Sequence, residues 1–237
     1  MLSRAADGAT TMIFDPLYLI LTVPALLFSV WAQFKVKSTF HRYEKVGVRS
    51  GLTGAQAAAA VVRAGGAEGV TIERHQGFLS DHYDPRSKTL RLSPPVYDGR
   101  SVSAVAVAAH EAGHSIQDAV GYAPLTLRSK LVPITMIGQQ LWFWPFMLGL
   151  FFGSTNLIWL GIIAFGAVVV FQLVTLPTEF NASNRAKAVL ATAGIVTTQE
   201  EARGVEKVLD AAAMTYVAAL VASLMQLLWM LLRARER

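Results

Sequence analysis

Four apolar stretches of this 237-residue chain contain no charged residue and are 18 to 22 residues long. They cover residues 17–34, 131–152, 157–176 and 211–232. A helix needs about 20 apolar residues to cross the roughly 30 Å hydrocarbon core of a bilayer, so each stretch can form one transmembrane helix. Charged residues, 16% of the chain, are confined to the rest. We therefore predict a multi-pass membrane protein with a modest part in water.

The long apolar runs also exclude other classes of protein. A transmembrane β-barrel alternates polar and apolar residues, and a disordered chain contains too few apolar residues to build a core. Four buried core helices are disfavoured, because the remaining chain is too short to cover them. The predicted fold class is mainly α: a polytopic membrane protein with four transmembrane helices and a small α+β cytoplasmic unit. The chain has no cysteine, which excludes disulfides and thiolate metal sites.

The basic residues predict the topology. Four spans place residues 35–130 and 177–210 on one side of the membrane, and these two segments hold 17 of the 21 Lys and Arg residues. The positive-inside rule makes that side cytoplasmic, in the inner cell membrane, with the tail of residues 1–16 and the C-terminus outside. Basic flanks such as Lys35 and Lys37 suit an anionic leaflet. The net charge of +5 therefore indicates a lipid bilayer as partner and no nucleic acid.

Residues 35–130 form the largest segment outside the predicted spans. Thr53 and Gln56 are spaced as a capping box that opens an alanine-rich helix, and the β-branched run at 70–73 favours a short strand. Asp84-Pro85 initiates a turn between residues 78–83 and 88–92, which predicts a hairpin. A helical pattern follows over 101–119.

Beyond the third span we predict a helix over 178–191 and a second capping box at Thr198, which opens a helix that continues into the fourth span.

The predicted helix over 101–119 contains an H-E-x-x-H motif, His110-Glu111-Ala112-Gly113-His114. Residues at i and i+4 share one helix face, so both imidazoles can bind one Zn²⁺. Glu111 is displaced around the helix and can act as general base on a water whose pKa the zinc lowers to about 7. The alternative is two surface histidines on an ordinary helix. Gly113 argues against it, because glycine costs about 1 kcal/mol relative to alanine in a helix.

A catalytic zinc site needs a third protein ligand, which must be nitrogen or oxygen here. Five carboxylates lie between the third and fourth predicted spans: Glu179, Glu200, Glu201, Glu206 and Asp210. Glu179 lies three residues beyond the third span, and two spans separate it from His114, so both lie on the same side of the membrane. We predict His110, His114 and Glu179 as metal ligands. Glu179 could alternatively be a first-turn carboxylate favoured by the helix dipole.

Several strings resemble one family of proteins: Ser50–Ala55 (S-x-L-T-G-A), Leu79–Arg86 (L-S-D-H-Y-D-P-R), Ala108–Asp118 (A-A-H-E-A-G-H-S-I-Q-D) and Leu176–Ser183 (L-P-x-E-F-N-A-S). They are similar to the bacterial YugP-type neutral zinc metallopeptidases, over about residues 31–230. The resemblance implies a membrane-embedded zinc peptidase whose small α+β cytoplasmic unit is zincin-like (gluzincin).

A more distant resemblance, to HtpX-type and CAAX-prenyl-type membrane proteases, concerns their E-x-x-A-D motif. It implies that Glu179 takes the ligand glutamate and Ala182 the alanine. Ser183 falls where those relatives carry an aspartate that orients a ligand histidine. Asn181, Ser183 or Asp118 could supply that support here.

The predicted hairpin precedes the H-E-x-x-H helix, and an edge strand there could pair with an extended peptide substrate. His82 and Tyr83 on it are candidates for donating to the developing oxyanion, or they are surface residues beside a turn. Arg185, two turns beyond Glu179, is another oxyanion candidate.

The motifs together predict a zinc metalloendopeptidase that hydrolyses membrane or membrane-proximal proteins, in quality control or processing. An intramembrane protease of the site-2 type is disfavoured, because Arg100 and Asp118 flank the motif helix. Transporters place ionisable residues inside their spans, and these four stretches have none. A catalytically silent zinc-binding scaffold remains the alternative.

Overall fold

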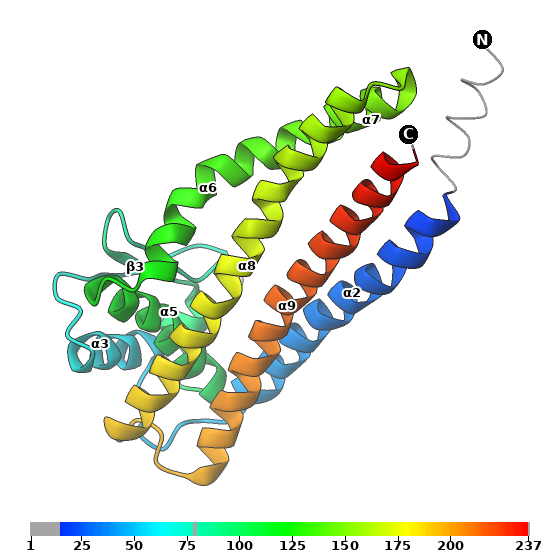
Figure 1. The fold of residues 1–237 in the computed structure, drawn as a ribbon. Coiled ribbons are helices and arrows are strands. Elements are labelled where there is room, and N and C mark those ends of the chain that lie inside the picture. The colour runs from blue at the N-terminus through cyan, green and yellow to red at the C-terminus, as the bar shows by residue number, and fades with distance from the viewer. Residues whose placement is uncertain (1–14, 78–79, 237) are drawn as a thin grey trace. The chain divides into compact units, whose positions relative to one another are not determined.

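The computed structural model describes residues 15–77 and 80–236 and is mainly helical (Figure 1). The elements in chain order are α2 (Pro16–Glu44), α3 (Gly54–Ala64), β1 (Thr71–Arg74), β2 (His82–Asp84), β3 (Thr89–Leu92), α4 (Pro94–Tyr97), α5 (Val102–Ala119), α6 (Ala123–Leu141), α7 (Phe143–Phe152), α8 (Thr155–Thr192) and α9 (Gln199–Arg235). The predicted tail of residues 1–16 lies almost entirely outside the described residues.

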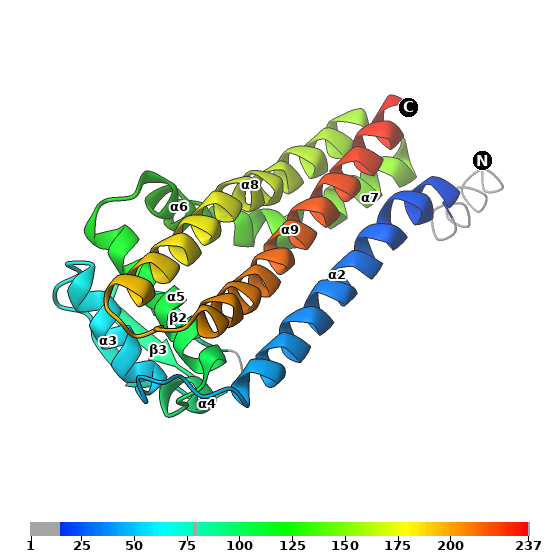
Figure 2. The same ribbon diagram turned by 90° about the horizontal axis from the view of Figure 1, so that it is seen from below.

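The described chain forms two compact units. The apolar unit comprises residues 15–31, 127–175 and 216–236, and the α/β unit comprises residues 32–126 and 176–215. The helices α2, α6, α8 and α9 each contribute to both units; Figure 2 follows these helices from a second side. Among the described residues, α2, α8 and α9 are long and apolar enough to cross a membrane.

The second predicted span is bent rather than straight. We expected one helix over residues 131–152, but α6 ends at Leu141 and α7 begins at Phe143, so the expectation of an unbroken helix was wrong. The cause is Pro145, which has no N–H to donate to the Leu141 carbonyl and whose ring would collide with it. The bonds from Trp142 to Gly138 (3.0 Å) and from Phe146 to Trp142 (3.3 Å) remain, so the chain bends without unwinding.

Glycines allow α6 and α7 to pack closely on α8 within the apolar unit. A Cβ atom at Gly138 would lie 2.5 Å from the carbonyl oxygen of Ala164, and one at Gly149 would lie 2.6 Å from the amide nitrogen of Ile158. Small residues permit this close backbone approach where lipid supplies no hydrophobic driving force between helices. At the turn between α7 and α8, Gly153 adopts a left-handed conformation with φ of 70°, which glycine tolerates best.

A buried carboxylate joins the first and last helices of the apolar unit. Asp15, 2% exposed, accepts hydrogen bonds from Trp229 Nε1 (2.6 Å) and Arg233 Nε (2.8 Å). Asp15 precedes α2, whereas both donors lie near the end of α9. Its charge is therefore paired and hydrogen-bonded, as a buried charge requires.

The sheet of the α/β unit has the order β1-β3-β2. β2 and β3 pair antiparallel, with His82 opposite Arg91, which confirms the predicted hairpin; Phe78 and Leu79 lie outside the described residues. Asp84 fixes the turn by accepting from the Arg86 backbone N–H (3.0 Å) and the Ser87 hydroxyl (2.9 Å). The predicted strand over 70–73 corresponds to β1, whose parallel pairing with β3 the sequence did not indicate.

The helix α5 forms the centre of the α/β unit. It packs against α3, α4, β2 and β3, and its residues are buried along most of its length. The predicted capping box of α3 is confirmed: the Thr53 hydroxyl accepts from the Gln56 backbone N–H, and the Gln56 side chain accepts from that of Thr53. Because α5 is enclosed by neighbours, its side chains are held in fixed positions.

Glu201 connects the loop after α2 to the start of α9. Its carboxylate is almost fully buried and accepts backbone N–H groups from Arg49 (2.7 Å), Thr197 (2.9 Å) and Thr198 (3.0 Å). The Glu201→Ala variant leaves these donors without an acceptor. We expect it to lower the free energy of unfolding by about 2–4 kcal/mol, measured as a lower thermal midpoint in detergent. Glu200→Ala, at an exposed neighbouring position, is the control and should leave the midpoint unchanged; equal midpoints for both variants would contradict this role of Glu201.

Candidate metal centre

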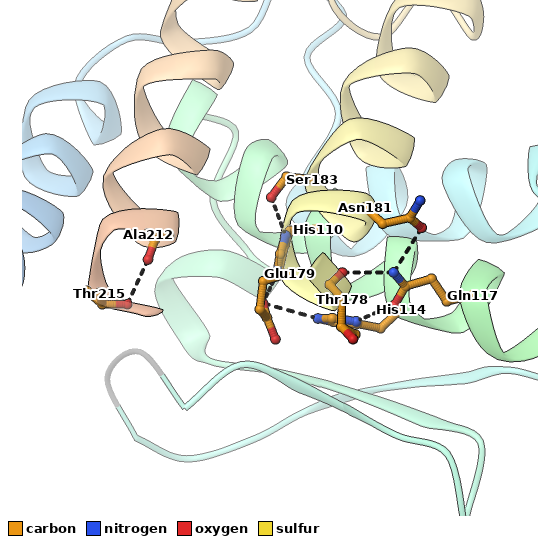
Figure 3. A network of polar contacts seen from close by, with 9 residues as sticks. All are labelled: His110, His114, Gln117, Thr178, Glu179, Asn181, Ser183, Ala212 and Thr215. Carbon is orange, nitrogen blue, oxygen red and sulfur yellow. Dashed lines mark hydrogen bonds and ion pairs between the residues drawn. The ribbon is translucent and has the colours of Figure 1, made fainter. Parts of the chain in front are cut away.

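The structure brings three predicted ligands together in the α/β unit (Figure 3). His110 and His114 lie one turn apart on α5, and Glu179 lies on α8. Glu179 Oε2 is 3.0 Å from His110 Nε2 and 3.5 Å from His114 Nε2. All three residues are buried, and Glu179 is only 1% exposed.

The geometry and chemistry of this group fit a zinc ion. Its ligand atoms all lie within 4.8 Å of one another. Atoms bound tetrahedrally at about 2.0–2.2 Å from zinc are separated by roughly 3.4 Å, close to the two distances above. Two imidazole nitrogens and one carboxylate oxygen are also a typical ligand set of a catalytic zinc, with the fourth position open. His110, His114 and Glu179 could therefore hold the metal.

Gly113 explains how α8 reaches the histidines. A Cβ atom at Gly113 would lie 2.6 Å from the carbonyl oxygen of Ala182 and 3.3 Å from its Cα, so the two helices touch through their backbones. Ala182 is itself completely buried. The glycine that weakens α5 as a helix thus allows the close approach of the segment that carries Glu179.

The second ring nitrogen of each histidine has its own partner. His110 Nδ1 lies 3.1 Å from the Ser183 hydroxyl oxygen, and His114 Nδ1 lies 2.9 Å from Gln117 Oε1. Ser183 thus contacts a predicted ligand histidine from the position where HtpX-type proteases carry the orienting aspartate. Gln117 was not among the predicted residues, although its spacing of three from His114 places it on the same helix face. Hydrogen bonds of this kind set the orientation and tautomer of metal-binding histidines.

Asn181 and Arg185 lie further out in the same network. Asn181 Oδ1 accepts from Gln117 Nε2 (3.0 Å) and from Arg185 Nε (2.8 Å). The guanidinium carbon of Arg185 also lies 5.9 Å from the centre of the Tyr122 ring. Asn181 therefore contacts Gln117 rather than a ligand histidine, and Arg185 is held by Asn181.

Asp118 contacts the hairpin. The Tyr83 hydroxyl donates to Asp118 Oδ2 (2.9 Å) and so links β2 to α5. Burial, followed by this hydrogen bond and the charge of Asp118, raises the pKa of Tyr83. His82 is exposed, and its Nδ1 lies 2.8 Å from the Ser80 carbonyl oxygen. Asp118 thus anchors the hairpin through Tyr83, whose proton is already committed to that bond.

Comparisons with known proteins identify the family of the chain, whose description names zinc. Residues 18–235 match a family described as "Putative neutral zinc metallopeptidase". The chain belongs to this family. A curated relative in Bacillus subtilis (strain 168), named "Putative membrane protease YugP", is 50% identical over 212 residues, which cover 90% of this chain and 94% of the relative. No solved structure matches the chain. The match to a zinc peptidase family and the helices long enough to cross a membrane both agree with the resemblance of the sequence motifs to membrane zinc peptidases.

Proposed function

We propose that this protein is a zinc-dependent membrane metalloendopeptidase of the gluzincin type. The convergence of His110, His114 and Glu179 on one buried point is the observation that carries the proposal. The substrates are membrane or membrane-proximal proteins, cut during quality control or processing.

In this proposal the three ligands hold the zinc, which when bound polarises the scissile carbonyl and activates water. Glu111 lies between the two histidines in sequence and is partly exposed. Its carboxylate takes a proton from the attacking water and delivers it to the leaving amine. The displaced position of Glu111 on α5 leaves it outside the three-residue ligand group.

The strand β2 offers a place for the substrate. It lies at an edge of the described sheet, and the bond from Tyr83 to Asp118 fixes it to the helix that carries both histidines. An extended peptide can add to such an edge through backbone hydrogen bonds. This pairing would select unfolded or extended segments.

For the membrane we propose four spans: α2, the bent pair α6 and α7, and the apolar parts of α8 and α9. Residues 35–130 and 177–210 then face the cytoplasm, because they hold most of the basic residues. The metal centre lies on that side of the inner membrane, and both termini lie outside.

Metal removal tests the proposal. Protein purified in detergent should contain about one zinc per chain and cleave an unstructured test protein, and a chelator should remove both the zinc and the cleavage. Added Zn²⁺ should restore cleavage, whereas Mg²⁺ should not, because it prefers oxygen ligands in octahedral geometry. Glu179→Gln should lower the zinc content, and Glu200→Gln is the control carboxylate. Cleavage that survives complete zinc removal would refute the proposal; zinc without any cleavage would indicate a scaffold.

A further inference from the structure

Gln117 is a buried polar residue of the metal centre that has no role in the preceding proposal. It lies on α5 three residues after His114 and is 0% exposed. Both the oxygen and the nitrogen of its side-chain amide have hydrogen-bond partners. Its Oε1 lies 2.9 Å from His114 Nδ1, and its Nε2 donates to the Thr178 carbonyl oxygen (2.8 Å) and to Asn181 Oδ1 (3.0 Å) (Figure 3).

The chemistry of the partners fixes which way each amide faces. A backbone carbonyl can only accept, so the end of Gln117 that faces Thr178 must be the NH₂ group. Arginine can only donate, so the atom of Asn181 that faces Arg185 Nε, 2.8 Å away, must be oxygen. That same oxygen accepts the second N–H of Gln117. Reversing either amide would place two donors or two acceptors against each other.

The orientation of Gln117 in turn determines the state of the His114 ring. With its oxygen facing Nδ1, Gln117 accepts a hydrogen bond from the Nδ1–H group, so the proton stays on Nδ1 and Nε2 keeps its lone pair. Nε2 is the atom that faces Glu179 Oε2 at 3.5 Å. His110 is held differently, because the Ser183 hydroxyl at its Nδ1 can either donate or accept.

We propose that Gln117 is a positioning residue for the metal centre, and that Arg185 and Asn181 set its orientation. A chain of hydrogen bonds runs from Arg185 through Asn181 and Gln117 to His114. It holds the His114 ring with Nε2 oriented to bind the zinc. This inference rests on the proposed function, and it assigns Arg185 to this network instead of to the oxyanion. Loss of an outer hydrogen bond of this kind costs about 10–100-fold in metal affinity.

Zinc affinity, measured by competition with a chelator, tests the inference without reference to peptide cleavage. Gln117→Met keeps the length of the side chain but removes both hydrogen-bonding ends, and should weaken zinc binding by about 10–100-fold. Asn181→Asp keeps an acceptor for both Gln117 and Arg185 and should bind zinc like the wild type. Asn181→Leu removes the acceptor and should weaken binding. The thermal midpoint of each zinc-free variant controls for folding.

Each outcome has a definite meaning. Wild-type affinity in Gln117→Met, or equal losses in Asn181→Asp and Asn181→Leu, would overturn the positioning role while leaving the zinc peptidase proposal intact. A wild-type protein that binds no zinc would overturn both. If Gln117→Met does not fold, the two Asn181 variants decide alone, because Asn181 is only half-buried.

Discussion

Replacing Glu111 with glutamine is expected to reduce peptide cleavage by about 10²–10⁴-fold, the usual contribution of a general base. An amide of the same size cannot take a proton from water or deliver one to the leaving amine. His110, His114 and Glu179 are unchanged in this variant, so zinc content and the thermal midpoint should remain those of the wild type. The measurement is the rate of cleavage of an unstructured substrate in detergent, together with zinc per chain.

The Glu200→Gln variant controls for the loss of one carboxylate, because Glu200 is exposed at the start of α9. It should cleave at the wild-type rate. Undiminished cleavage by Glu111→Gln would remove Glu111 from the mechanism, whereas loss of both zinc and cleavage would show that Glu111 maintains the site instead of transferring protons.

Replacing Gly113 with alanine is expected to disrupt the metal centre through the backbone. The new Cβ would meet the Ala182 carbonyl at 2.6 Å, and no side-chain rotation can relieve a contact with a main-chain atom. Overpacking of this kind costs about 1–3 kcal/mol, and it displaces the segment of α8 that holds Glu179. Because a misplacement of 1 Å can cost about 10²-fold in rate, we expect cleavage to fall by about that factor and zinc affinity to fall with it.

The sign of the stability change distinguishes this explanation from a simple helix-propensity effect. Alanine stabilises a helix by about 1 kcal/mol relative to glycine, so an unobstructed site would gain stability. Gly166→Ala on α8 is the matched control, because no atom lies within 4 Å of its new Cβ. We expect a lower thermal midpoint for Gly113→Ala and an equal or higher one for Gly166→Ala. A higher midpoint for both would show that α5 and α8 have room between them.

The parts of the fold that depend on local pattern followed from the sequence. Charge-free runs mark the apolar helices, and the capping box at Thr53 depends on residues three positions apart. The two histidines share a face because an α-helix has a fixed period. Glu179 was predicted among five carboxylates because it lies three residues beyond the third predicted span. The two predicted spans between it and His114 meet only a necessary condition, which the other four carboxylates meet as well.

The parts of the fold and of the candidate site that depend on residues distant in the sequence could not be predicted from it. Apolar length alone predicts a span over residues 131–152 without the break at Pro145. The parallel pairing of β1 with β3 has no signature in either strand alone. Gln117 carries no charge and belongs to no common metal motif, so only the contacts with Thr178 and Asn181 reveal its position. The hydrogen bond between Tyr83 and Asp118 joins residues 35 positions apart, and neither position in the sequence indicates the other.

The distance along the chain between the ligands has a consequence for biogenesis. Glu179 follows His110 by 69 residues, and α8 runs without interruption from its apolar beginning at Thr155 past Glu179 to Thr192. A ribosome therefore synthesises both imidazoles before the carboxylate, and the apolar stretches 131–152 and 157–176 lie between them in the sequence. A nascent chain that stops before Glu179 lacks the third proposed zinc ligand. The proposed enzyme would therefore be unable to hydrolyse peptide bonds until residues 131–176 had been synthesised.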